Sequence, residues 1–366
     1  MNYLFSTFLL FFSTGLIGQN TMDSIFTQAL EKGITKGMAE KNVPGLVIAI
    51  LEEGELIYQQ DFGWADVEKE VPTTAKTGFN IGSISKLFTA WGVMKLVQEG
   101  KLDLDAPVES YLTRWSLPPS DFDHNKVTIR ALLSHTAGLS VHGYPGFSPE
   151  LPLPSIEASL AGENGPVRDN EKVEVIIAPQ TKFKYSGGGY TILQLLIEEV
   201  SQMSFAEYMH KAIFKPLGMR QTSFMIDKKI LKNSAQPYDE EGELISMHRF
   251  AAQAAAGLHT NLTDLIEFAK ACLSKNPILE TETVQSMMTA PEAANGQYGL
   301  GFRILQLGPV TLKGHAGSNY GWQSGMMLHP PSKSGIIMLS NGSQGDDVLI
   351  ATLRQWVTWK MSNNKF

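Results

Sequence analysis

A serine and a lysine three residues apart form the pattern with the clearest chemical use. Ser83 and Lys86 stand at the two ends of the S-x-x-K string at 83–86, where a predicted strand is followed by a predicted helix. A serine at a helix start lies beside free backbone N–H groups and the positive end of the helix dipole. Lys86 follows one turn later on the same face, within reach of the Ser83 hydroxyl. Because serine is a weak nucleophile without a base, the pair predicts covalent catalysis, although an N-cap serine followed by a solvated lysine has the same spacing.

Tyr185 precedes three glycines in the string FKYSGGGY (183–190), and an apolar helix is predicted from Tyr190 onward. A nearby ammonium favours the phenolate form of a tyrosine. Tyr185 could therefore exchange protons with a lysine and a serine brought close to it. Taken alone, the string is also consistent with a turn tyrosine that packs on Phe183.

His315 opens the string HAGS (315–318) at the end of a predicted strand. Small residues such as Gly317 would let a substrate backbone lie along the strand edge. The backbone N–H of Ser318 could form an oxyanion hole with the backbone N–H of Ser83. Taken alone, the string is also typical of a polar strand end.

Strands are predicted near both ends of the chain, and helices are predicted between them. Apolar runs bounded by turns predict strands at 45–51, 56–62, 77–81, 302–305, 310–313, 325–328 and 335–339. Apolar residues at helical spacing predict helices at 22–42, 83–99, 190–200, 263–273 and 347–361, with a further helix after a capping box at 204–207.

This arrangement predicts an α/β protein of the α+β type, in which an antiparallel sheet built from both chain ends is flanked by helices. The expected organisation is one catalytic domain over residues 22–361. Its α/β layer covers about 22–105 and 295–361, and an inserted, mostly helical region covers about 106–294.

Taken together, the three strings and their order resemble the serine β-lactamases and penicillin-binding peptidases, in particular the class C-like branch with its esterases and D-amino-acid peptidases. The resemblance runs from about 43 to 342 and includes VPGLVIAI (43–50), LLSHTAGL (132–139), PLGM (216–219), AAGLHTNLTDL (255–265) and YGLGF (298–302). It implies that Ser83 is the acylated nucleophile, Lys86 its partner and Tyr185 the general base or proton relay. It also implies that His315 stands at the third motif, with Gly317 and Ser318 beside the substrate.

Two positions depart from the lactamase pattern. Gly187 stands where the second motif usually has an asparagine whose amide holds an acylamino group, and His315 stands where the third motif usually has a lysine. A histidine is neutral about half the time or more near pH 7, so it offers a substrate carboxylate no fixed charge. Both changes argue for an esterase or D-peptidase over an efficient β-lactamase. The alternative is a non-catalytic penicillin-binding sensor or cell-envelope scaffold that keeps the pocket.

Composition excludes several other classes of function. Among 366 residues, 30 basic and 37 acidic side chains give a net charge of −7, which argues against a nucleic-acid partner. A single cysteine, Cys272, excludes an intrachain disulfide, and the eight histidines form no H-E-x-x-H or similar metal string. We therefore expect no metal and no cofactor. The expected partner is a small-molecule or peptide acyl substrate, with cell-wall-derived peptides among the candidates.

The first 18 residues, MNYLFSTFLLFFSTGLIG, predict a signal peptide. Their apolar core is too short for a confident membrane span, so no stable span is expected. No lysine or arginine precedes the core, which is unusual for such a leader. The expected location is secreted or periplasmic.

Overall fold

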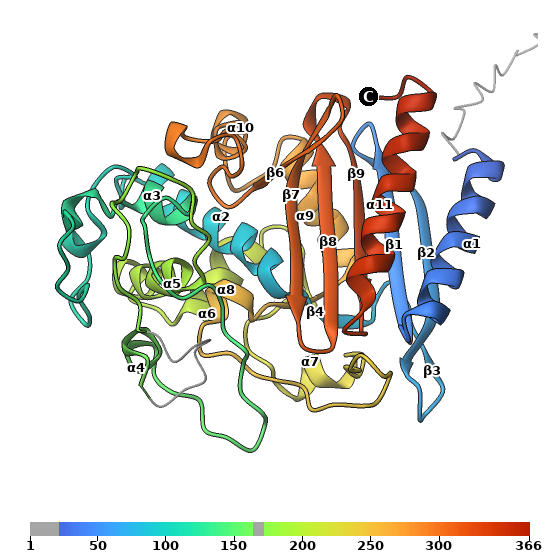
Figure 1. The fold of residues 1–366 in the computed structure, drawn as a ribbon, viewed down its shortest axis with the longest axis horizontal. Helices are drawn as coiled ribbons and strands as arrows, with labels where there is room; N and C mark the ends of the chain where they lie inside the picture. The colour runs from blue at the N-terminus through green and yellow to red at the C-terminus, as the bar shows by residue number, and fades with distance from the viewer. Residues whose placement is uncertain (1–21, 164–171) are drawn as a thin grey trace, which may run out of the picture.

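The computed structural model describes residues 22–163 and 172–366. The predicted signal peptide at 1–18 lies outside the described residues. Figure 1 shows a central sheet with two terminal helices on one side and most of the remaining helices on the other. No helix among the described residues has the length and hydrophobicity needed to cross a membrane.

Seven strands form one antiparallel sheet in the order β3-β2-β1-β9-β8-β7-β6. Their bounds are β1 Gly45–Glu52, β2 Glu55–Asp66, β3 Val71–Pro72, β6 Arg303–Leu307, β7 Val310–Asn319, β8 Trp322–His329 and β9 Ser334–Ser340. The first and last thirds of the chain meet where β1 pairs with β9. The predicted fold class is therefore confirmed.

The interior strand β1 is apolar on both faces because helices cover both sides of the sheet. Val47 and Ala49 point into the larger core, whereas Ile48 and Ile50 point into the smaller one. The smaller core lies beneath the two terminal helices, α1 (Ser24–Glu40) and α11 (Gly345–Ser362), which pack side by side in Figure 1.

The larger core surrounds α2 (Ser85–Gln98), a helix that is buried on nearly every side. Helices that begin at Gly187, Phe205, Gln253 and Leu262 pack against α2, within a set of helices from the middle of the chain. This set comprises α3 Ile129–Leu133, α4 Ile156–Ala161, α5 Gly187–Ser201, α6 Phe205–Met209, α7 Lys228–Lys232, α8 Gln253–Ala256, α9 Leu262–Leu273 and α10 Thr281–Met287; a small ribbon pairs β4 (Gly78–Asn80) with β5 (His259–Asn261). This packing brings the start of α2 to the edge of the large sheet.

Two element boundaries differ from the sequence prediction near the candidate site. Helix α5 begins at Gly187 rather than at Tyr190, because the Ser186 hydroxyl caps it by accepting the Gly189 N–H at 3.1 Å. Strand β7 extends to Asn319 instead of ending near 313, because its pairing with β8 continues to that residue. His315, Gly317 and Ser318 therefore lie within the strand.

Candidate active site

Ser83 lies in a 3₁₀ turn (Gly82–Ile84) that leads into α2. The turn needs a glycine at its first position, where Gly82 adopts φ +50°. A Cβ on Gly82 would come within 2.7 Å of the Ser318 backbone nitrogen, so the turn is pressed against β7. The Asn80 side chain accepts the Gly82 N–H at 2.9 Å and fixes this approach.

Lys86 is buried one helical turn beyond Ser83. Its Nζ lies 3.3 Å from Ser83 Oγ and donates a 2.6 Å hydrogen bond to the Ala255 carbonyl of α8. Burial lowers the pKa of Lys86 from 10.5 to about 7. Near neutral pH, a substantial fraction of this amine is therefore unprotonated and able to accept a proton.

Tyr185 lies just before α5 and closes the same group of side chains. Lys86 Nζ lies 4.9 Å from the centre of the Tyr185 ring, and the phenol hydrogen-bonds to Ser83. Burial raises the pKa of Tyr185 above its ordinary value, and the Ser83 contact opposes this only in part. The expectation that the lysine ammonium would favour a phenolate is wrong, since desolvation dominates and Tyr185 remains a neutral phenol.

His315 lies on β7 and is buried. The centre of its ring is 6.1 Å from the centre of the Tyr185 ring. Its Nδ1–H donates to the Ala316 carbonyl. Burial, followed by the nearby Lys86 charge, lowers the pKa of His315 to about 3. The expectation of partial protonation near pH 7 is therefore wrong, because the imidazole is neutral throughout the physiological range.

Gly317 and Ser318 form the part of β7 that faces the start of α2. A Cβ on Gly317 would come within 2.0 Å of the Ile81 carbonyl, so only glycine allows this contact. The Ser318 hydroxyl accepts a 3.0 Å hydrogen bond from Gln323, while its backbone nitrogen lies beside Gly82.

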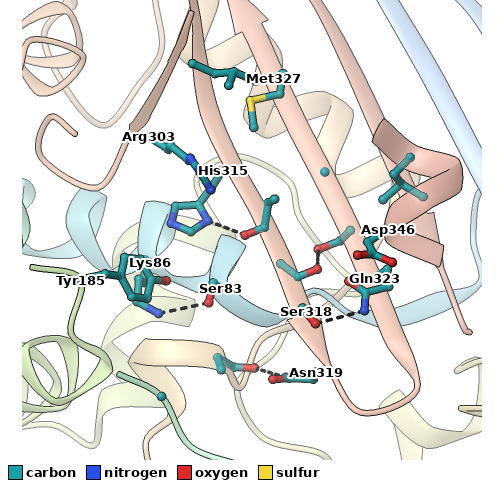
Figure 2. A pocket seen from close by; sticks show the side chains of 18 of the residues that line it. Ser83, Lys86, Tyr185, Arg303, His315, Ser318, Asn319, Gln323, Met327 and Asp346 are labelled. Carbon is teal, nitrogen blue, oxygen red and sulfur yellow. Dashed lines mark hydrogen bonds between the residues drawn. The ribbon is translucent and has the colours of Figure 1, made fainter. Parts of the chain in front are cut away.

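One cavity of about 690 Å³ is lined by all six residues that the sequence singled out, namely Ser83, Lys86, Tyr185, His315, Gly317 and Ser318. Figure 2 shows Ser83, Lys86 and Tyr185 grouped together, with His315 near them on strand β7. The same cavity continues past β7 to the other face of the sheet, where Leu305, Met327 and Leu349 belong to the smaller core. Across residues 22–163 and 172–366, no three metal-binding side chains gather into a group.

Two side chains near the site have no role in the sequence prediction. Arg303 is exposed on β6, lines the cavity, and its charge contributes to lowering the pKa of His315. His135 is buried against Tyr185, with 4.1 Å between ring centres. The one sequence signal for Arg303 is that it is a lone cation within an apolar predicted strand. For His135, the string SH at 134–135 indicates only a turn.

Three features define the class of penicillin-binding and β-lactamase-like proteins. They are a serine at the start of a buried helix, a lysine one turn later, and the edge of an antiparallel sheet beside both. The family model described as Beta-lactamase matches residues 30–357, and the chain belongs to that family. The resemblance found in the sequence is therefore confirmed.

Similar proteins agree with this assignment. Protein flp of Staphylococcus aureus (strain MRSA252) is 26% identical over 338 residues, which cover 88% of this chain and 63% of that protein. The chain thus spans less than two thirds of that relative. Penicillin-binding protein 4* of Bacillus subtilis is 26% identical over 341 residues, covering 87% of this chain and 72% of that protein. The solved octameric penicillin-binding protein homologue from Pyrococcus abyssi superposes with a TM-score of 0.73 at 30% identity, covering 89% of this chain and 77% of the other.

Proposed function

We propose that the protein is a serine hydrolase that cleaves an ester or a D-amino-acid peptide bond through an acyl-enzyme on Ser83. The observation that carries this proposal is the position of the Lys86 amine, buried at 3.3 Å from Ser83 Oγ with a pKa near 7. A nucleophile beside a base that is partly neutral at working pH meets the requirement for covalent catalysis. Family membership and the name of the Bacillus subtilis relative support the same class of chemistry.

In this mechanism, neutral Lys86 accepts the proton as Ser83 Oγ attacks the substrate carbonyl carbon. The backbone N–H groups of Ser83 and Ser318 stabilise the oxyanion that forms. Tyr185, a neutral phenol near both Ser83 and Lys86, passes a proton to the leaving oxygen or nitrogen and is reprotonated by Lys86. Water then attacks the acyl carbon, the Ser83 ester bond breaks, and Ser83 regains its proton.

The environment of the third motif supports weak handling of β-lactams. His315 is a neutral group, and Gly187 has no side-chain donor, so both usual contacts to a β-lactam are missing. Ester hydrolysis is therefore the first candidate activity.

Arg303 supports cleavage of a D-residue peptide with a free carboxylate as the second candidate activity. This exposed guanidinium lines the cavity, and no ion pair to a carboxylate is found for it within the described residues. Guanidinium groups bind carboxylates in two parallel hydrogen bonds. Arg303 could thus supply the positive charge that His315 lacks.

The test compares p-nitrophenyl acetate, a D-Ala-terminated peptide and nitrocefin as substrates for the wild type and Ser83→Ala. We expect ester turnover, little nitrocefin turnover, and a loss of about three or more orders of magnitude in Ser83→Ala. Labelling by a fluorophosphonate should map to Ser83 by mass spectrometry. Acylation of Ser83 without turnover of any substrate would instead support the non-catalytic sensor or scaffold.

Arg303→Ala separates the two substrate classes. If Arg303 binds a carboxylate, the variant loses kcat/KM for the peptide by roughly tenfold or more while the ester is little affected. Arg354→Ala is the matched control, since Arg354 is an exposed arginine on α11 that does not line the cavity. Equal effects of Arg303→Ala on both substrates would exclude carboxylate binding.

We also propose that the protein acts outside the cytoplasm, because its first 18 residues have the composition of a signal peptide. Expression of the full chain, followed by cell fractionation and N-terminal sequencing of the exported product, tests this. A cytoplasmic product that retains Met1 would contradict it.

A further inference from the structure

The turn at His135 holds the backbone on both sides of Tyr185. The His135 carbonyl accepts the Lys184 N–H at 2.8 Å, and His135 Nδ1 accepts the Ser186 N–H at 3.1 Å. The residues immediately before and after Tyr185 are thus both hydrogen-bonded to one residue, which lies 50 positions earlier in the chain. The two bonds limit how far the Tyr185 backbone can shift or rotate.

The ring of His135 adds a third restraint. It lies against the Tyr185 ring, with 4.1 Å between ring centres and 37° between planes. The side chain is 2% exposed, and the backbone adopts φ +56°, a left-handed conformation that non-glycine residues seldom adopt. A residue held in such a conformation is one that the surrounding structure strongly determines.

The protonation state of His135 is also determined by its surroundings. Because Nδ1 accepts a hydrogen bond, the proton of the neutral ring resides on Nε2. Burial and the Lys86 charge hold the pKa of His135 well below its ordinary value. The ring therefore remains a neutral acceptor toward Ser186 over the physiological pH range.

We propose that His135 is a positioning residue that holds the Tyr185 phenol in place between Ser83 and Lys86. The proposal rests on the proposed function, in which Tyr185 transfers a proton. His135 does not contact the substrate in this scheme and acts through Tyr185 alone. Small displacements of a proton-transfer group are costly, because rates depend steeply on its alignment with the reacting atoms.

Two amide substitutions separate the hydrogen bond from the bulk of the side chain. In His135→Asn, Oδ1 occupies about the position of Nδ1 and can still accept the Ser186 N–H, and asparagine tolerates the left-handed backbone. In His135→Gln, the same amide lies one atom further out and cannot make that bond. Neither variant keeps the ring, so the comparison isolates the acceptor.

Kinetics are measured on the full chain with an ethyl ester or a D-Ala-terminated peptide, because the alkoxide or amine that leaves needs the proton that Tyr185 supplies. Each rate is normalised to the fraction of enzyme that a fluorophosphonate labels. We expect His135→Gln to lower kcat about 100-fold with little change in KM, as expected for a misplaced catalytic group. His135→Asn should stay within about tenfold of wild type, the size of one lost aromatic contact. If His135→Gln does not fold, His135→Ala takes its place.

Ser134→Ala is the matched control, because Ser134 directly precedes His135 and its hydroxyl bonds only to near neighbours, the Arg130 carbonyl of α3 and the Thr136 hydroxyl. It should lower thermal stability without lowering the normalised kcat. A similar fall in kcat for Ser134→Ala would mean that the turn has a general structural role, which would overturn the proposal.

A double-mutant cycle with Tyr185→Phe tests whether His135 acts through Tyr185. We expect Tyr185→Phe/His135→Gln to be no slower than Tyr185→Phe alone. Additive losses would overturn the proposal. If Tyr185→Phe by itself acylates at the wild-type rate, the role of Tyr185 in the proposed function is what fails. If Tyr185→Phe is slow but His135→Gln is as fast as the wild type, the proposed positioning role of His135 is wrong.

Discussion

At the scale of single residues, burial decides which group can act as a base. Lys86 and Tyr185 lie close together, yet desolvation lowers the pKa of Lys86 and raises that of Tyr185. The reason is that a low-dielectric environment disfavours the charged form of each group, which is protonated lysine in one case and phenolate in the other. Lys86 is therefore the group that titrates near pH 7.

This difference predicts the pH dependence of Ser83 acylation. Below a pH of about 7, Lys86 is mostly protonated and cannot accept a proton, so the rate should rise with pH and level off above that value. The rate of fluorophosphonate labelling, measured from about pH 5 to 9, checks this. A rate that is constant over this range would contradict the assignment of Lys86 as the base.

His315→Lys should improve the use of substrates that carry a carboxylate. The lysine adds a positive charge, and hydrogen bonds to charged groups are worth about 1.5–3 kcal/mol, so the peptide-to-ester ratio of kcat/KM should rise tenfold or more. Because the pKa of His315 is about 3, the wild-type ring is neutral on both sides of pH 7. The introduced lysine is buried beside Lys86, so burial should lower its pKa as well and the gain should be larger at the lower pH. Lys86 titrates in the same way with both substrates, so its effect cancels in the peptide-to-ester ratio of kcat/KM. An unchanged ratio would contradict a role for position 315 in binding the carboxylate.

At the scale of elements, the site depends on how closely the start of α2 approaches β7. Gly82 and Gly317 permit that approach, since added Cβ atoms would lie 2.7 Å from the Ser318 nitrogen and 2.0 Å from the Ile81 carbonyl. Asn80, at the end of β4 and just before the 3₁₀ turn, accepts a 2.6 Å hydrogen bond from the Asn319 side chain, which ties the segment leading into α2 to β7.

Gly82→Ala should therefore damage the site more than the fold. The variant has to adopt a left-handed backbone, at a cost of about 1–3 kcal/mol, and must push the Ser318 backbone away from Ser83. We expect the free energy of unfolding to fall by about this amount. We expect kcat/KM to fall by more than the resulting loss of folded protein accounts for. Denaturant titration and ester kinetics measure the two effects. Gly100→Ala is a useful comparison, because it has φ +70° with no atom within 4 Å of an added Cβ.

At the scale of the whole molecule, the two cores on either side of the sheet bury polar groups along with apolar ones. His135, His259 and His315 are all buried and neutral, with pKa values lowered chiefly by burial, to about 4 in His259. Neither ring nitrogen of His259 has a hydrogen-bond partner in the described structure. Such histidines make the fold sensitive to acid.

Stability should consequently fall as the pH falls below about 6.5. In that range the unfolded chain binds protons on these histidines and the folded chain does not, so each contributes a loss of up to about 1.4 kcal/mol per pH unit. For His259 the loss ends near its folded pKa of about 4. Thermal melts from about pH 4 to 8 check this, with His259→Gln expected to flatten the profile. An acid-independent melting temperature would contradict the prediction.

The sequence by itself determined the fold class, the order of most strands and helices, and the residues at the centre of the site. These features depend on local signals, namely apolar runs bounded by turns, such as the one at 45–51, and the short spacing of Ser83 and Lys86. The boundaries at Gly187 and Asn319 escaped prediction, because a cap and a strand pairing set them, and both involve partners chosen by the fold.

Tertiary structure alone decided the chemistry of the individual groups. Whether Lys86 loses basicity, whether Tyr185 is a phenol and whether His315 is ever charged all depend on how much water each group loses on folding, which no short string encodes. The same holds for His135 and Arg303, which lie far from Tyr185 and Ser83 in the chain. Their proximity to the site results from long-range packing, so sequence spacing could not predict their positions.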